Sequence, residues 1–122
     1  MHAANINQRA FLFACRIIVL SERLHKAGVV ARHAGLQLLG SGTSIGANLE
    51  EATAGQTKPD FVSKVSIALK EARETKYWLR LIDAGGLLQN ESLAADIQEA
   101  DELIAILTAI VKRARESPSR GS

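Results

Sequence analysis

The sequence predicts an all-α protein, an antiparallel up-down-up-down four-helix bundle that occupies residues 1–116. Apolar residues recur at alternating spacings of four and three along four segments, a pattern typical of bundle helices. Aromatic residues make up only 4% of the chain, which favours helix packing over a β-sandwich. The connections between the four segments are short, so consecutive helices should be antiparallel neighbours. A chain of 122 residues is long enough to bury the core of one domain.

The first two helices are expected at about residues 5–27 and 29–54, with Gly28 as the stop between them. The second helix carries glycines and small polar residues in its interior. Each interior glycine costs about 1 kcal/mol relative to alanine, so these residues indicate a close backbone approach. The apolar stripe of the first helix is Ile6, Ala10, Phe13, Ile17, Leu20 and Leu24. The stripe of the second helix is Ala31, Gly35, Leu38, Gly42, Ile45, Leu49 and Ala52.

The third and fourth helices are expected at about residues 59–83 and 92–116, followed by a flexible tail at 117–122. Pro59 and Asp60 favour a first helical turn, and Ser92 is a suitable N-cap. Gly85 and Gly86 close the third helix. The stripe of the third helix is Phe61, Val65, Ala68, Ala72, Thr75, Leu79 and Ile82. The stripe of the fourth helix is Leu93, Ile97, Ala100, Ile104, Leu107 and Val111.

Charge and composition exclude several classes of protein. The net charge of +2 is the sum of +4 over residues 1–49, −5 over 50–111 and +3 over 112–122. This segregation indicates either a basic binding face or complementary packing between helices and subunits. The single cysteine, Cys15, excludes an internal disulfide framework. Because the sequence shows no secretion signal and no apolar run of about 20 residues, we expect a cytoplasmic protein with no membrane contact.

A polar stripe lies beside the apolar one on the second helix and continues on the third. Polar side chains in such positions suit hydrogen bonds that fix helix register and partner choice. Apolar residues away from the core stripe of the third helix, including Trp78, favour an oligomer interface; the alternative is a wide core face. The predicted helix-packing or oligomer contacts are Ser41, Ser44, Asn48, Glu51, Ile67, Glu71, Glu74 and Trp78.

An enzymatic interpretation is the least favoured. Glu51, Glu71 and Glu74 could form a general acid–base site, but no nucleophile, positioned histidine or metal-ligand set accompanies them. The glycines near Ser41 do not follow a strand, as a dinucleotide-binding loop requires. We therefore expect no enzymatic activity, no catalytic residues, no metal and no cofactor.

Basic residues of the first helix form a row. Arg9, Arg16 and Arg23 repeat every seven residues, so they share one helix face that could track phosphates. No aromatic residues are interleaved with them for base stacking. The alternatives are a solvated face, or ion pairs with the fourth-helix residues Asp96, Glu99 and Glu102. The candidate nucleic-acid-binding residues are Arg9, Arg16, Arg23, Arg32, Lys112, Arg113 and Arg115.

Two blocks of sequence carry a family pattern. The first, within residues 37–52, contains Ser-Gly-Thr-Ser-Ile-Gly-Ala-Asn and then Glu-Ala. The second, within residues 60–79, contains Ile-Ala-Leu-Lys-Glu-Ala and then Tyr-Trp-Leu. Over roughly residues 30–112 the chain resembles the four-helix-bundle proteins of the 23S rRNA intervening-sequence protein family. It departs from their pattern at Gly40 and Glu50, where a basic residue is usual, and at Leu49, where an aromatic residue is common.

The resemblance implies a left-handed bundle that assembles into a ring-like homopentamer, and it carries no catalytic residues. Similar bundle proteins accompany diversity-generating retroelements, where they bind RNA and a reverse transcriptase. We therefore expect a non-enzymatic oligomeric scaffold or interaction protein that binds RNA or a nucleic-acid-processing partner. The alternative is a module that binds a small anionic ligand at a cleft between subunits.

Overall fold

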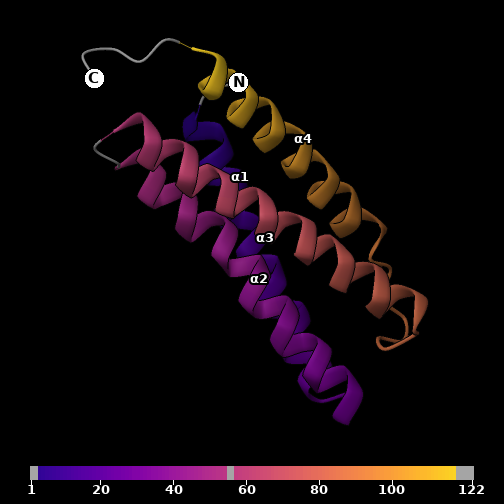
Figure 1. Ribbon diagram of the computed structural model, residues 1–122. Helices are drawn as coiled ribbons and strands as arrows, with labels where there is room; N and C mark the ends of the chain where they lie inside the picture. The colour runs from indigo at the N-terminus through magenta and orange to yellow at the C-terminus, as the bar shows by residue number, and fades with distance from the viewer. Residues whose placement is uncertain (1–2, 55–56, 118–122) are drawn as a thin grey trace.

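The computed structural model describes residues 3–54 and 57–117, which form four helices. These are α1 (Ala3–His25), α2 (Val29–Thr53), α3 (Lys58–Ala84) and α4 (Ala94–Glu116). Consecutive helices pack side by side, and the start of α1 lies at the same end of the bundle as the end of α4 (Figure 1). No strand occurs in these two ranges, so the all-α fold class is confirmed. The left-handed twist stays a prediction.

The helix ends follow the local chemistry of the sequence. Gly28 precedes α2 with a φ of 126°, a conformation that glycine adopts without strain. The side chain of Thr57 caps α3 by accepting a hydrogen bond from the backbone N–H of Asp60 at 3.2 Å. Gly85 ends α3, as predicted. Helix α1 ends at His25, two residues earlier than expected.

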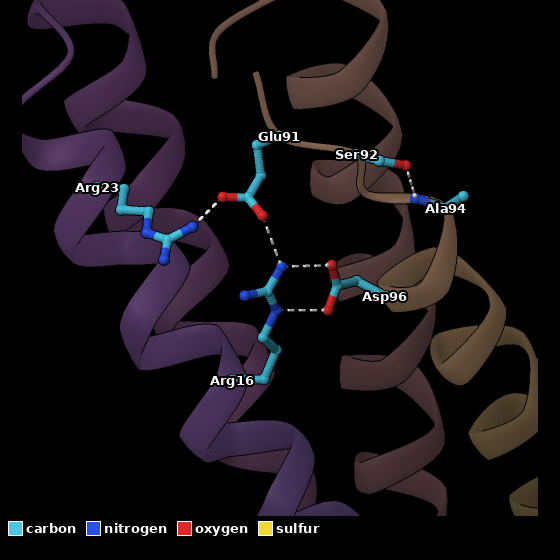
Figure 2. A network of polar contacts seen from close by, with 6 residues as sticks. All are labelled: Arg16, Arg23, Glu91, Ser92, Ala94 and Asp96. Carbon is cyan, nitrogen blue, oxygen red and sulfur yellow. Dashed lines mark hydrogen bonds and ion pairs between the residues drawn. The ribbon is translucent and has the colours of Figure 1, made fainter. Parts of the chain in front are cut away.

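The beginning of α4 differs from the sequence prediction. Leu93, not Ser92, is the N-cap residue, and the helix begins at Ala94 instead of residue 92. The Ser92 hydroxyl still accepts a hydrogen bond from the Ala94 N–H at 3.4 Å, so it caps from one position further out (Figure 2). Ser117 follows α4 in an extended conformation. The rest of the predicted tail lies outside the described residues.

The core contains the predicted stripes of α1 and α2 in full, and that of α3 except for the half-buried Phe61. The α4 stripe is rotated from the prediction. Leu103 is completely buried, whereas Ile97 and Ile104 are only half-buried. Asp96, which is 6% exposed, occupies a core-facing position one turn before Ala100. An ionic partner on α1 explains why an aspartate is accommodated there.

Helices α1 and α2 approach each other closely, as the interior glycines predicted. A Cβ atom on Gly42 would lie 2.8 Å from Cγ2 of Ile17, and one on Gly35 would lie 2.9 Å from Cβ of Leu24. Both distances are too short for real contacts, so only glycine fits at these positions. The glycines are seven residues apart and form one continuous seam. None of the helices in residues 3–54 and 57–117 has the length and apolar character needed to cross a membrane.

Candidate functional site

The arginine row of α1 faces α4 and is engaged by its carboxylates. Arg9 donates hydrogen bonds from Nε and Nη2 to the two carboxylate oxygens of Glu99, at 3.0 and 2.6 Å. Its Nη2 also donates to Glu102 at 2.7 Å. Arg9 thus forms the ion pairs with α4 carboxylates that the sequence offered as an alternative to phosphate binding. A guanidinium held by two carboxylates is poorly available to phosphate.

The same arrangement repeats further along the helix (Figure 2). Arg16 donates from Nε and Nη2 to both oxygens of Asp96, at 2.9 and 3.2 Å, and from Nη2 to Glu91 at 3.1 Å. Glu91 lies between Arg16 and Arg23 and accepts from both. Glu91, in the connection before α4, was not part of the predicted pairing. Glu91 lies outside the helix, three residues before Ala94, so a helix-periodicity argument could not place its side chain.

These contacts shift the ionisation equilibria in the direction that stabilises the charged forms. Hydrogen bonds to Glu99 and Glu102 raise the pKa of Arg9, and those to Asp96 and Glu91 raise the pKa of Arg16. The hydrogen bond from Arg16 lowers the pKa of Glu91, and the one from Arg9 lowers the pKa of Glu102. Arg9, Arg16, Glu91 and Glu102 are therefore charged at neutral pH.

The other predicted nucleic-acid-binding residues are placed differently. Arg32 is exposed and donates from Nε to the carbonyl oxygen of His25 at 3.2 Å. Lys112, Arg113 and Arg115 are exposed on the last turns of α4. Within residues 3–54 and 57–117, none of these four side chains forms an ion pair. The seven candidates therefore fall into two groups. The three arginines of α1 are paired with carboxylates, whereas the other four basic side chains form no ion pair within the described residues.

The polar stripe of α2 makes fewer contacts between helices than its position suggested. The hydroxyls of Ser41 and Thr75 are both buried and hydrogen-bonded to each other at 2.9 Å, which links α2 to α3. Ser44 instead donates to the Gly40 carbonyl at 2.7 Å, and Asn48 donates to the Ser44 carbonyl at 2.8 Å. Both stay within α2, because small polar side chains readily bond the carbonyl four residues earlier.

The three glutamates considered for acid–base chemistry do not share one environment. Glu51 is exposed and pairs with Lys64 of α3 at 2.7 Å. Glu74 is also exposed, whereas Glu71 is half-buried. In the part of the chain that the structure describes, no three His, Cys, Asp or Glu side chains come together in a way that could hold a metal ion.

The aromatic patch predicted on α3 is partly packed against the bundle. Trp78 is half-buried, contacts the core, and stacks edge-on against His33 of α2 and Tyr77, with ring centroids 6.1 and 5.7 Å apart. Ile67 is half-buried, and Leu81 is 41% exposed. The patch offers a modest apolar surface between α2 and α3.

Sequence reasoning missed an exposed apolar surface on α1. On α1, Phe11, Leu12, Ile18 and Val19 are 63, 58, 45 and 40% exposed, and the exposed Cys15 lies among them. We call these five residues the α1 outer face. They lie opposite the core stripe with the same spacings of three and four, so a helical projection of residues 11–19 would have revealed them.

A groove continues this surface onto α2. It has a volume of about 180 Å³, and its lining combines the apolar Ile18, Leu36 and Leu39 with the polar Ser21, Glu22, His25 and Arg32. Leu36 is 58% exposed, so the apolar surface extends across the seam between the two helices.

A second cavity, of about 630 Å³, lies where the α1–α2 turn meets the α3–α4 connection. Arg23 and Lys26 line it together with the first residues of α2. Arg23 is already paired with Glu91, which leaves Lys26 as the other cation. The small-anion alternative stays a prediction.

Comparisons with known proteins agree with the geometry. A family model described as 23S rRNA-intervening sequence protein matches residues 3–109. The fold is similar to the crystal structure of a protein of unknown function from the S23 ribosomal protein family of Bacteroides thetaiotaomicron. That protein is 36% identical, the match covers 92% of this chain and 99% of the other, and the TM-score is 0.83. No protein of curated function matches the sequence. The chain therefore belongs to the 23S rRNA-intervening sequence protein family.

Proposed function

We propose that the protein is a non-enzymatic scaffold that assembles from copies of this chain and presents a surface to RNA or to a nucleic-acid-processing protein. The observation that carries the assembly is the α1 outer face. Monomeric proteins rarely expose contiguous apolar surfaces larger than a few hundred Å², and larger ones mark interfaces. Phe11, Leu12, Ile18, Val19 and the neighbouring Leu36 are each at least 40% exposed, and we take them as such an interface.

A second copy of the chain is the occupant that fits this surface best. The only charged side chain between Ala10 and Ser21 is Arg16, which is turned toward Asp96 and away from the outer face. The α1 outer face itself therefore offers an incoming charged partner nothing to pair with, and the charged Glu22 and Arg32 lie only in the groove at its edge. Depletion of charge at the centre is typical of interfaces between protein subunits.

A ring requires two different patches on every copy, because each subunit contacts its two neighbours through different surfaces. The α2–α3 edge around Trp78 and Leu81 supplies a second apolar patch. This supports a head-to-tail arrangement, and the family resemblance makes a homopentamer the expected number. A ring would also repeat any weak binding surface and so raise its avidity for a long partner.

Light scattering tests the assembly with a pair of matched variants. Val19→Glu puts a charge on the α1 outer face, whereas Val30→Glu puts the same charge on an exposed valine at the first turn of α2. We expect a multiple of the 13.1 kDa chain mass for the wild type and for Val30→Glu, and a smaller mass for Val19→Glu. A wild-type mass of 13.1 kDa at all concentrations would refute the proposal.

A further inference from the structure

We infer that the groove between the first half of α3 and the last turns of α4 binds the phosphodiester backbone of a nucleic-acid strand. This inference deepens the nucleic-acid part of the proposed function and rests on it, but it does not depend on the number of subunits. It starts from the basic side chains that form no ion pair within the described residues 3–54 and 57–117.

Four of these cations gather on the two walls of one surface, which we call the α3–α4 groove. Lys70 and Arg115 line one part of it, with a volume of about 570 Å³. Arg73, Lys112 and Arg115 line the adjoining part, with a volume of about 420 Å³. Arg115 lines both parts, so the two parts adjoin. Each helix contributes two cations three residues apart, and that spacing places both on the same side of the helix.

Nothing in the described chain neutralises these four residues. Within residues 3–54 and 57–117, none of them pairs with a carboxylate, although Glu116 lines the groove beside Lys112. Further along the same two helices, Lys76 and Asp101 do pair at 2.6 Å. Along the contact between α3 and α4, the cations are therefore paired with a carboxylate near Asp101 and form no ion pair toward the end of α4.

The helix dipole does not account for the arrangement. Cations favour the last turn of a helix, which would explain Arg115 alone. Lys70 and Arg73, however, lie in the middle of α3, where the dipole has no effect.

A phosphate backbone fits this groove better than an acidic protein does. Protein interfaces are typically centred on aromatic anchors with few charges, and the groove lining contains no aromatic residue and several cations. Cations in rows track phosphates without reading bases, so binding should depend little on sequence. Because four phosphates would be contacted, the logarithm of affinity should fall with the logarithm of salt concentration with a slope of about −3 for a single strand.

The test compares two double variants that remove the same charge. Arg73→Gln/Arg115→Gln removes one cation from each wall of the groove, while Lys26→Gln/Arg80→Gln changes two exposed cations that do not line it. Affinity for a fluorescent oligouridylate of about 20 nucleotides is measured by anisotropy from low to high salt. We expect a loss of at least about tenfold and a slope shallower by about 1.4 for the groove variant. The control should stay within about threefold of the wild type.

Equal losses in both variants would overturn the inference, because they would show a diffuse charge effect. Displacement of the RNA by polyglutamate as readily as by unlabelled RNA would also overturn it, in favour of an acidic protein partner. A single-stranded DNA of the same length distinguishes the two kinds of phosphate backbone. Light scattering on the same samples separates the two proposals: an assembly of the expected mass that binds no RNA at about 50 mM salt overturns this inference alone.

Discussion

Helix α1 meets α2 along a seam of glycines and meets α4 along a row of arginines, and both seams repeat every seven residues. At the first seam, Gly35 and Gly42 bring the backbones so close that a methyl group does not fit. At the second, Arg9 and Arg16 extend across the gap to carboxylates, and the two helices make few other contacts.

The difference shows how one helix can hold two neighbours by different forces. The glycine seam depends on short-range packing, which is nearly independent of salt and pH. The arginine seam depends on partly exposed charges, whose attraction is screened by salt and lost when carboxylates are protonated. We therefore expect the α1–α2 contact to be rigid and the α1–α4 contact to be the part of the bundle that responds to solution conditions.

The largest expected effect breaks the glycine seam. Gly42→Ala and Gly40→Ala both gain about 1 kcal/mol of helix propensity, since both glycines lie within α2. Only Gly42→Ala also forces a methyl group against Ile17, which typically costs about 1–3 kcal/mol. A Cβ on the exposed Gly40 would meet nothing within 4 Å.

Urea unfolding of the two variants at the same protein concentration measures the difference. We expect Gly40→Ala to be the more stable by about 1–3 kcal/mol, because the propensity gain is common to both. Equal midpoints would mean that the seam has room for a side chain, and the comparison between the two seams would fail.

A smaller effect is expected from breaking the arginine seam. Arg16→Met keeps the aliphatic stem but leaves the buried Asp96 without its main partner. Hydrogen bonds to charged groups are worth about 1.5–3 kcal/mol, so we expect a loss of about 1–2 kcal/mol after allowing for the exposed edge of the pair. The control is Arg23→Met, because that guanidinium is half-exposed and should contribute less than about 0.5 kcal/mol. The same urea unfolding measurement checks both variants. A larger loss of stability for Arg23→Met than for Arg16→Met would contradict the expectation that the more exposed pair contributes less.

The smallest effect is the pH dependence of the same seam. The pKa values of Glu91 and Glu102 are lowered in the folded state from the ordinary 4.5, so the unfolded chain binds protons first as pH falls. Their contribution to stability is complete above that ordinary value and is lost as pH drops through the lowered folded values. The raised pKa values of the arginines add no dependence in this range.

Unfolding free energies measured from about pH 7 to about pH 3 should therefore decline below about pH 4.5 in the wild type. In an Arg9→Met/Arg16→Met variant the decline should be shallower, because each glutamate has lost the hydrogen bond that lowers its pKa most, although Arg23 still acts on Glu91 and Gln98 on Glu102. An identical profile in both proteins would assign the acid sensitivity to other carboxylates.

The sequence predicted the fold better than it predicted the surfaces. The stripes of α1 and α2 were recovered in full because heptad spacing determines which side of a helix is buried. The rotation of α4 was missed, since Asp96 is polar and its burial depends on a guanidinium 80 residues away. Ser44 and Asn48 were expected to bond between helices, but their spacing serves intrahelical carbonyls equally well, and periodicity does not distinguish the two.

The interaction surfaces required the structure for a different reason. Seven basic residues were candidates for nucleic-acid binding, and a sequence does not show which cations are neutralised. Arg9, Arg16 and Arg23 are paired with carboxylates of α4 or with Glu91, while Lys70 and Arg73 come close to Lys112 and Arg115 only through the packing of α3 on α4. The α1 outer face, by contrast, was visible in the spacing of Phe11, Leu12, Ile18 and Val19.

The reactivity of Cys15 tests the central claim, assembly through the α1 outer face, most directly. This thiol is exposed in the single chain and lies among the apolar residues of that face. If a second copy covers the face, the rate of alkylation by a maleimide should fall steeply as protein concentration rises, and Val19→Glu should restore the fast rate. A rate that is fast at every concentration, and equal in the wild type and Val19→Glu, would contradict assembly through this surface.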